Sequence, residues 1–292
     1  MNKIFYDEKM PHTAGYYWKK MNKKRIAAAE TVLRERELRC VSACSRFFRR
    51  SSPKDAVWIL YSRDSGGQAL IVYVNRTLLP VFSGNREIPE PKFLKRFFGP
   101  LPVHSVQGLS GDVIFLEKWL LQYGLDAIDK IDYDLMCIDA YPQSSTYSKP
   151  AGLILRSAQR SDLDALAALQ AEYEQEEVLP AGAEFYPAVS RLNMEKIFAN
   201  EQLLVAELGG RVVGKINTSA RSFTRFQVGG VYVLPGFRNR GIARYMTAEF
   251  VRTLIGQGRG VSLFVKKNNP AAQAVYRRLG FTFLADYRIS YY

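Results

Sequence analysis

Histidine and cysteine are scarce in this chain, which has two histidines and three cysteines among 292 residues. Zinc sites and His-based nucleophilic triads rely on these residue types, so their scarcity argues against both. Three cysteines are also too few for a disulfide framework. We expect Cys40 and Cys44, four residues apart on a predicted helix, to be buried free thiols, and we expect no metal.

Long apolar runs are lacking as well. No stretch of about 18 uninterrupted apolar residues occurs, so we expect no membrane-spanning helix. Residues 1–10 lack the apolar core of a signal peptide. Both absences predict a cytoplasmic protein with no membrane partner. The apolar content of 47% argues against global disorder, and the length suits two compact domains.

Acidic residues are outnumbered, at 28 against 41 basic residues, which gives a formal charge of +13. Many of the basic residues lie between Lys19 and Arg50. Such a segment could bind nucleic acid or an anionic surface. Because Glu30, Glu35 and Glu37 lie among them, the solvated faces of amphipathic helices are the stronger interpretation.

One segment indicates an anion site. The apolar strand pattern Val231–Pro235 runs into the basic turn Arg238–Ala243, and the helical pattern Arg244–Ile255 follows. A strand, turn and helix in this order aim free backbone N–H groups and a positive helix dipole at one point, where a phosphate or pyrophosphate would bind. Gly241 permits close approach of a ligand, and the small Ala243 keeps the first helical turn open. By itself, the segment equally fits an ordinary strand-to-helix connection.

A second segment follows in the order needed to complete such a site. After the apolar strand Gly260–Val265, Asn269 precedes a proline and reads as a helix N-cap, and Gly280 reads as the C-cap. Ala272 and Tyr276 are four residues apart and share one helix face. The small side chain at 272 leaves room for a ligand beside the phenol of Tyr276.

Together these segments resemble the GNAT superfamily of acyl-CoA-dependent N-acyltransferases, and the resemblance covers residues 152–292. A Gly-Gly-Val-Tyr-x-x-Pro strand at residues 229–235 brings the chain closest to one branch of that superfamily. The family's loop, Arg/Gln-x-x-Gly-x-Gly/Ala, reads here Arg238-Asn239-Arg240-Gly241-Ile242-Ala243. Its second block, Asn-x-x-Ala-x-x-x-Tyr-x-x-x-Gly-Phe, is matched by Asn269, Ala272, Tyr276, Gly280 and Phe281.

The resemblance implies acetyl-CoA as the acyl donor. The pyrophosphate would bind the backbone N–H groups of the loop, and the strand before it would hold the pantetheine arm. If this strand splays from its neighbour, the gap admits the arm and leaves a backbone N–H near the thioester oxygen. The implied acyl-CoA-binding residues are Val231, Tyr232, Val233, Arg238, Asn239, Arg240, Gly241, Ile242, Ala243, Asn269, Ala272 and Tyr276.

The predicted reaction is direct attack of a primary amine on the thioester, for which positioning is the first requirement. By position Tyr276 matches the family's general acid, although a tyrosine that only packs the core is the alternative. The favoured bases are Glu177 and Glu176, at the polar end of a helix. Tyr232 and the carboxylate of Tyr292 are weaker candidates.

The acceptor amine and the oligomeric state are left open by the sequence. Polar residues near a strand end that could face the acceptor are Asn217, Thr218 and Arg221. Two other functions stay open. The first is an acyl-CoA-binding regulatory module with little catalysis, and the second, less favoured, is a nucleic-acid-binding protein.

For residues 149–292 we expect a GNAT-like domain with a mixed α/β sheet. Gly209-Gly210 signals the hairpin in its middle. The expected elements are strands at 153–156, 202–208, 211–219, 225–233 and 260–265, helices at 161–173, 188–199, 244–255 and 270–279, and a closing antiparallel pair at 281–285 and 287–292.

Residues 1–148 form an N-terminal α/β domain that we expect to be either a degenerate copy of the same fold or an unrelated domain. On the first hypothesis the strand and helix at 101–123 correspond to those at 225–255. A linker is expected at 141–150. The expected elements are a helical region at 18–50, hairpin strands at 56–61 and 69–74 around Asp64–Gly67, a strand at 101–106, a loop at 107–111, a helix at 112–123 and a strand at 132–139.

Overall fold

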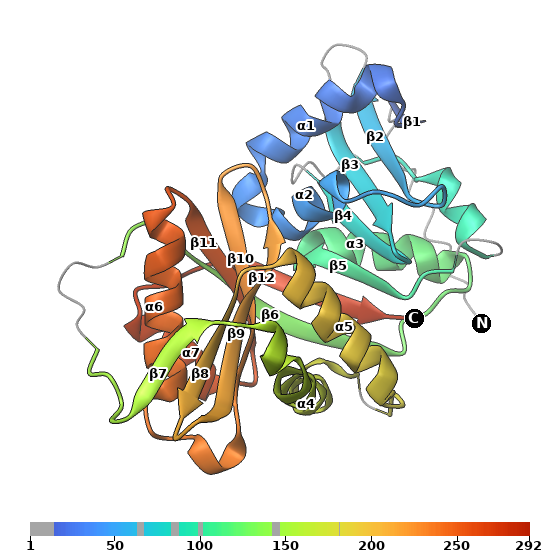
Figure 1. Ribbon diagram of the computed structural model, residues 1–292. Helices are drawn as coiled ribbons and strands as arrows, with labels where there is room; N and C mark the ends of the chain where they lie inside the picture. The colour runs from blue at the N-terminus through green and yellow to red at the C-terminus, as the bar shows by residue number, and fades with distance from the viewer. Residues whose placement is uncertain (1–14, 63–66, 83–87, 99–101, 142–146, 181) are drawn as a thin grey trace, which may run out of the picture.

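The computed structural model describes residues 15–62, 67–82, 88–98, 102–141, 147–180 and 182–292 (Figure 1). Its strands join into one mixed sheet with helices on both faces. The strands are β1 (Tyr16–Lys20), β2 (Ala56–Ser62), β3 (Gly67–Val74), β4 (Thr77–Val81), β5 (Ser105–Leu109), β6 (Asp129–Ile138), β7 (Leu153–Ser157), β8 (Leu203–Leu208), β9 (Arg211–Arg221), β10 (Arg225–Val233), β11 (Gly260–Lys266) and β12 (Thr282–Tyr291).

The helices lie between groups of strands along the chain, since β2–β4 and β8–β10 follow one another without an α-helix. The α-helices are α1 (Ile26–Glu35), α2 (Val41–Phe48), α3 (Ser110–Gln122), α4 (Leu163–Tyr173), α5 (Pro187–Asn200), α6 (Ile242–Gly256) and α7 (Pro270–Arg278). Shorter turns of 3-10 helix include η2 (Glu37–Arg39) and η3 (Lys92–Phe98), and η5 (Glu174–Val178) is a turn of π-helix.

The sheet has the same strand order when it is followed inward from either edge. Strands β1 to β5 run inward from one edge and β7 to β11 from the other, and β12 and β6 lie between them. The pair β4·β5 is parallel and so is β10·β11, whereas β12·β5, β11·β6 and β12·β6 are antiparallel. Two helices follow β1 and two follow β7, and one helix precedes β6 and one precedes β12. This topology supports the duplication hypothesis, with the last strand of each half exchanged into the other half.

The correspondence between the halves differs from the one expected at residues 101–123. By sheet position, β5 and α3 match β11 and α7, whereas β4 is the counterpart of β10. Strand β4 was not expected from the sequence, and β5 begins later than the expected strand at 101–106 and includes Gln107–Leu109, which were expected in a loop. The short run Thr77–Val81 follows β3 after only two turn residues, Asn75 and Arg76, which both have positive φ, and it pairs back on β3.

Two other expectations were wrong. Residues 18–20 belong to strand β1 rather than to the helical region expected at 18–50, because every residue of β1 pairs with β2. Residues 282–291 form one strand with a bulge near Ala285 rather than a hairpin. Both edges of β12 are taken by β5 and β6, which come from the N-terminal half, so the segment has no need to fold back on itself.

Core packing explains why the strands are apolar on both faces. In β2, Val57 and Ile59 pack under α1 and α2, while Trp58 and Leu60 pack on the α3 side. Such alternation between two buried faces is typical of a sheet covered by helices on both sides. In the C-terminal half, α4 and α5 cover one face and α6 the other.

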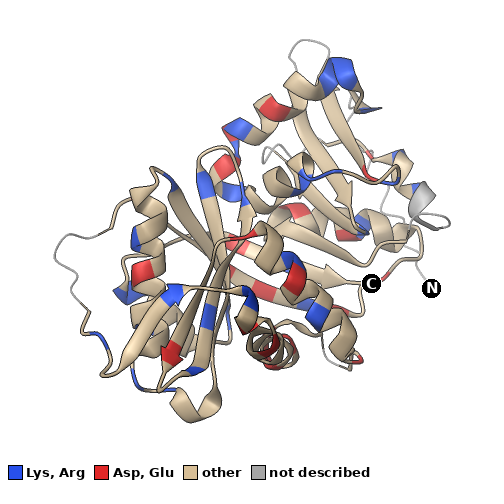
Figure 2. Cartoon of the chain, viewed as in Figure 1, with Lys and Arg blue, Asp and Glu red and all other residues tan. Residues whose placement is uncertain are grey.

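Charged residues are dispersed over the molecule. In the view of Figure 2, Lys and Arg lie on several helices and strands of both halves, with Asp and Glu between them. The described cysteines Cys40, Cys44 and Cys137 are free and buried. Within the described residues, no helix combines the length and the apolar character required to cross a membrane.

Candidate active site

Strands β10 and β11 pair at one end and separate at the other. Their parallel register runs from Arg225 opposite Gly260 to Val228 opposite Leu263, although β10 continues to Val233. On its other edge β10 bulges, because two residues between Gly229 and Tyr232 oppose a single residue of β9. A cavity of about 520 Å³ opens where the strands separate, between the end of β10, the start of α6 and one face of α7.

The start of α6 provides backbone donors at this cavity. Gly241 is the N-cap with φ of +76°, a left-handed conformation that favours glycine, and no side chain caps the helix. Asn239 is also left-handed, with φ of +62°. The first N–H groups of a helix have no intrahelical acceptor and carry the positive end of the dipole, so this end of the cavity suits an anion.

The opposite wall is built from the π-helical turn that extends α4. Glu176 accepts hydrogen bonds from the hydroxyl of Tyr232 (2.6 Å) and from Nη2 of Arg238 (2.8 Å). Burial raises the pKa of Glu176, but these two donors outweigh it and hold the pKa below its usual range. Arg238 also donates from Nε to the carbonyl of Val233 (2.9 Å). Glu176 therefore ties the end of β10 to the π-helical turn.

Glu177 faces the first turn of α7 and has looser contacts. Its carboxylate lies 3.5 Å from Nδ2 of Asn269 and 3.6 Å from Nζ of Lys266. Asn269 caps α7 as expected, since its Oδ1 accepts from the backbone N–H of Ala272 (3.0 Å). The Asn269 amide thus joins the helix start to Glu177.

Tyr276 lies on the face of α7 that lines the cavity and is 8% exposed. Its ring packs edge-on against Phe281, with centroids 5.9 Å apart. Burial raises its pKa, and the nearby Tyr173 and Glu177 raise it further. The phenol therefore keeps its proton at neutral pH, as a proton donor must.

The cavity brings together nearly all of the residues predicted from the sequence. Its walls include Val231, Tyr232, Val233, Arg238, Asn239, Gly241, Ile242, Ala243, Asn269, Ala272, Tyr276, Glu176 and Glu177. Of the described loop residues in the predicted set, Arg240 does not line it and instead donates from Nη2 to the carbonyl of Gly236 (3.2 Å).

Several lining residues were missed by the sequence analysis. Phe237, Arg244, Thr247 and Arg278 line the same cavity. Arg244 Nε and Thr247 Oγ1 are buried and have no hydrogen-bond partner among the described residues. Helical spacing from Gly241 would have placed Arg244 and Thr247 on one face of α6, three residues apart.

The residues proposed to face an acceptor lie elsewhere. Asn217 and Thr218 are buried in β9, and Thr218 Oγ1 donates to Glu201 (2.6 Å). Arg221 is at the far end of the same strand. Asn217 Nδ2 donates to the carbonyl of Thr218 (2.9 Å), and Thr218 Oγ1 accepts from the backbone N–H of Gln202 (3.1 Å), so both polar side chains have partners in the sheet and its flanking segment.

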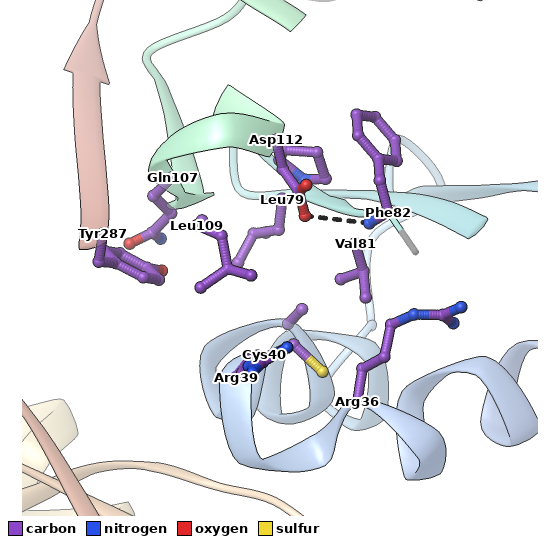
Figure 3. A pocket seen from close by; sticks show the side chains of 13 residues that line it. Arg36, Arg39, Cys40, Leu79, Val81, Phe82, Gln107, Leu109, Asp112 and Tyr287 are labelled. Carbon is purple, nitrogen blue, oxygen red and sulfur yellow. Dashed lines mark hydrogen bonds between the residues drawn. The ribbon is translucent and has the colours of Figure 1, made fainter. Parts of the chain in front are cut away.

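The N-terminal half contains a smaller cavity of about 180 Å³ at the corresponding place (Figure 3). There β4 and β5 pair only as far as Leu78 opposite Val106 and then separate. Asp112 accepts from the backbone N–H of Phe82 (3.0 Å), and Arg36 lies on the opposite wall. Burial raises the pKa of Asp112 to about 6, against smaller opposing effects of Phe82 and Arg36. The described part of the β4–β5 connection is η3, a 3-10 helix, in place of the α-helix that follows β10.

Comparison with known proteins identifies relatives of the C-terminal half. Residues 164–281 match the model of the acetyltransferase (GNAT) family. A mycothiol acetyltransferase of Amycolatopsis mediterranei (strain U-32) is 34% identical over 116 residues, which cover 34% of this chain and 38% of the relative. The match thus spans less than half of that relative's length.

Solved structures match nearly the whole chain in fold, at low identity. A protein of Drosophila has a TM-score of 0.65 at 12% identity, covering 95% of this chain and 99% of that one. A tandem GNAT protein from the clavulanic acid biosynthesis pathway has a TM-score of 0.57 at 14% identity, covering 94% and 97%. A GCN5-related N-acetyltransferase from Sphaerobacter thermophilus has a TM-score of 0.56 at 19% identity, covering 96% of each. These structures, all below 25% identity, show a shared fold, whereas the match to the GNAT family model over residues 164–281 supports membership of the C-terminal half in the GNAT superfamily.

Proposed function

We propose that this protein is an acyl-CoA-dependent N-acyltransferase that transfers acetyl from acetyl-CoA to a primary amine. The observation that carries the proposal is the cavity between β10, α6 and α7, which collects both sequence blocks of the family. We expect the pyrophosphate at the start of α6, the pantetheine arm along Val231–Val233 and the thioester beside Tyr276. Arg244 and Thr247 line the same cavity and are further candidates for contact with the cofactor.

In the proposed reaction the amine nitrogen attacks the carbonyl carbon of the thioester. A backbone N–H of the bulged strand would stabilise the oxyanion that forms. The C–S bond then breaks, and Tyr276 donates its proton to the departing sulfur. The proton lost by the acceptor nitrogen passes to a carboxylate.

We assign that carboxylate to Glu177, acting directly or through water. Glu176 is the weaker candidate, because its pKa is held low by Tyr232 and Arg238, which makes it a poorer proton acceptor. We assign Glu176 instead to positioning Arg238 and the end of β10.

The test is a thermal-shift titration with acetyl-CoA and longer acyl-CoAs, followed by an amine panel with detection of free CoA thiol. Stabilisation by acetyl-CoA with thiol release on one or more amines is the expected result. Stabilisation without thiol release would favour the acyl-CoA-binding regulatory module, and no stabilisation by any acyl-CoA would overturn both.

We also propose that residues 1–148 and 149–292 are the two domains of the protein, and that the protein is located in the cytoplasm.

A further inference from the structure

A buried lysine lies beside the bulge of β10. Lys215, in β9, is 0% exposed. Its Nζ donates to the carbonyl of Gly230 (3.1 Å) and to Oδ1 of Asn217 (3.3 Å), and lies 4.9 Å from the ring centre of Tyr173. Lysine is rarely buried completely unless an opposite charge pairs with it, and among the described residues no carboxylate forms an ion pair with Lys215.

The surroundings of Lys215 fit a neutral amine. Burial lowers its pKa to about 7, and the charge of Glu174 opposes this shift. A neutral amine has two N–H groups, which match the two acceptors at Gly230 and Asn217. A buried polar group whose hydrogen bonds are satisfied in this way costs far less than an unpaired charge.

Gly230 is held from two sides. Its φ of +60° is left-handed, and a Cβ at this position would lie 2.2 Å from Asn217 Oδ1 and 2.8 Å from Lys215 Nζ. Its carbonyl accepts a hydrogen bond from Lys215 Nζ. Its backbone N–H is hydrogen-bonded to Tyr173. Burial raises the pKa of Tyr173 to about 12, and this hydrogen bond opposes the rise. The residues that follow, Val231 and Tyr232, line the cavity.

The N-terminal half serves as an internal comparison. Its strands β3 and β4 pair in a regular register without a bulge, from Leu70 opposite Val81 to Val74 opposite Thr77. The residues of β3 in this ladder, 70–74, are apolar and buried. The same fold thus forms this strand pair without a buried lysine, so folding alone does not account for Lys215. Both the lysine and the bulge belong to the half that has the family's loop.

We propose that Lys215 is a positioning residue for acyl transfer, which fixes the backbone of Gly230 and Val231 so that the bulged strand presents a free N–H to the thioester carbonyl. This inference rests on the proposed function. Lys215 touches the strand that carries the thioester, not the start of α6. Its loss should therefore impair the chemical step much more than the capture of acyl-CoA.

The first test is Lys215→Met, which keeps the length and volume of the side chain and removes its N–H groups. We expect kcat to fall about 10- to 100-fold while the KM for acetyl-CoA changes less than about threefold. The matched control is Lys196→Met, at an exposed position of α5. Unchanged kcat, or a parallel loss of acyl-CoA binding and of thermal stability, would overturn the inference.

The second test is a double-mutant cycle that combines Lys215→Met with Gly230→Ala, whose Cβ would displace the side chains of Lys215 and Asn217. The control is Gly256→Ala, where a Cβ would meet no other atom within 4 Å. We expect each single variant to be slow and the double variant little slower than either, because both remove one interaction. Hydrogen exchange at residues 230–233 should also quicken in Lys215→Met. If the losses of kcat in the two single variants multiply in the double variant, and hydrogen exchange at residues 230–233 is unchanged in Lys215→Met, the inference is wrong. If the wild-type protein is inactive and no acyl-CoA stabilises it, the proposed function itself is wrong.

Discussion

At the scale of single residues, the site separates two glutamates that are neighbours in sequence. Glu176 is bound by Tyr232 and Arg238, whereas among the described residues Glu177 has only the longer contacts with Asn269 and Lys266. A turn of π-helix carries both, and π-turns change the angle between successive side chains and occur often at functional sites. The two carboxylates can therefore have different roles.

Glu177→Gln should lower kcat, because the amide cannot accept a proton, whereas Glu176→Gln should mainly raise the KM for acetyl-CoA by loosening Arg238. We expect a fall of about 100-fold in kcat for the first variant and less than about tenfold for the second. Steady-state kinetics with both substrates varied separates the two. Equal losses of kcat in both variants would contradict the division of roles.

Tyr276→Phe removes the proposed proton donor and keeps the ring that packs against Phe281. We expect kcat to fall about 100-fold and the KM for acetyl-CoA to change less than about threefold. Tyr186→Phe, at the exposed start of α5, is the control and should act as the wild type. A Tyr276→Phe variant with full turnover would show that this tyrosine only packs the core.

Lys215 should make stability depend on pH above neutrality. Its pKa is about 7 in the folded chain and about 10.4 when unfolded, so between these values the unfolded chain holds the additional proton. The free energy of unfolding should therefore rise with pH across this window in the wild type relative to Lys215→Met, and the difference should be constant below pH 7. Urea unfolding at several values from pH 6 to 10 measures this free energy for both proteins. If the free energy of unfolding has the same pH dependence in the wild type and in Lys215→Met, the prediction is wrong.

At the scale of elements, the start of α7 links folding to the site. Asn269 uses one amide atom to cap the helix and the other to approach Glu177. The sequence predicted the cap correctly, because Asn before Pro at a helix start is a local signal. It could not predict the second contact, which depends on where α4 ends in space.

Asn269→Ala should destabilise the protein by about 1 kcal/mol through loss of the cap. Asn269→Asp should retain most of that stability, because its carboxylate can still accept from the Ala272 N–H, yet it should weaken activity by repelling Glu177. Urea unfolding and turnover of both variants check this. An alanine variant as stable as the wild type would show that the cap contributes nothing.

At the scale of the whole molecule, the two halves share one sheet through their exchanged last strands. Strand β6 pairs with β11 and β12, and β12 pairs with β5 and β6. Helix α2 also lies against the C-terminal half, where Ser42 Oγ donates to Gln227 Oε1 (2.9 Å). Neither half completes its own sheet.

We therefore expect one cooperative unfolding transition for the full chain by calorimetry. Residues 149–292 expressed alone should be insoluble, since β11 and β12 would expose unpaired edges. Co-expression with residues 1–148 should restore soluble protein. Two separate transitions, or a soluble and folded C-terminal fragment, would refute this coupling.

The sequence alone predicted the helix starts of the C-terminal half to within two residues, the paired glycines of the β8–β9 hairpin and the two blocks at residues 238–243 and 269–281. These signals are local, since capping, turn conformation and helical spacing depend on residues close together in the chain. Only the tertiary structure decided that residues 282–291 are one strand, that β4 exists as a separate strand, and that Lys215 lies buried under Gly230. The single strand at 282–291 depends on β5 and β6, which are far away in sequence, and the burial of Lys215 depends on Gly230 in the next strand. Strand pairing and burial of this kind leave no fixed spacing in the sequence by which to find them.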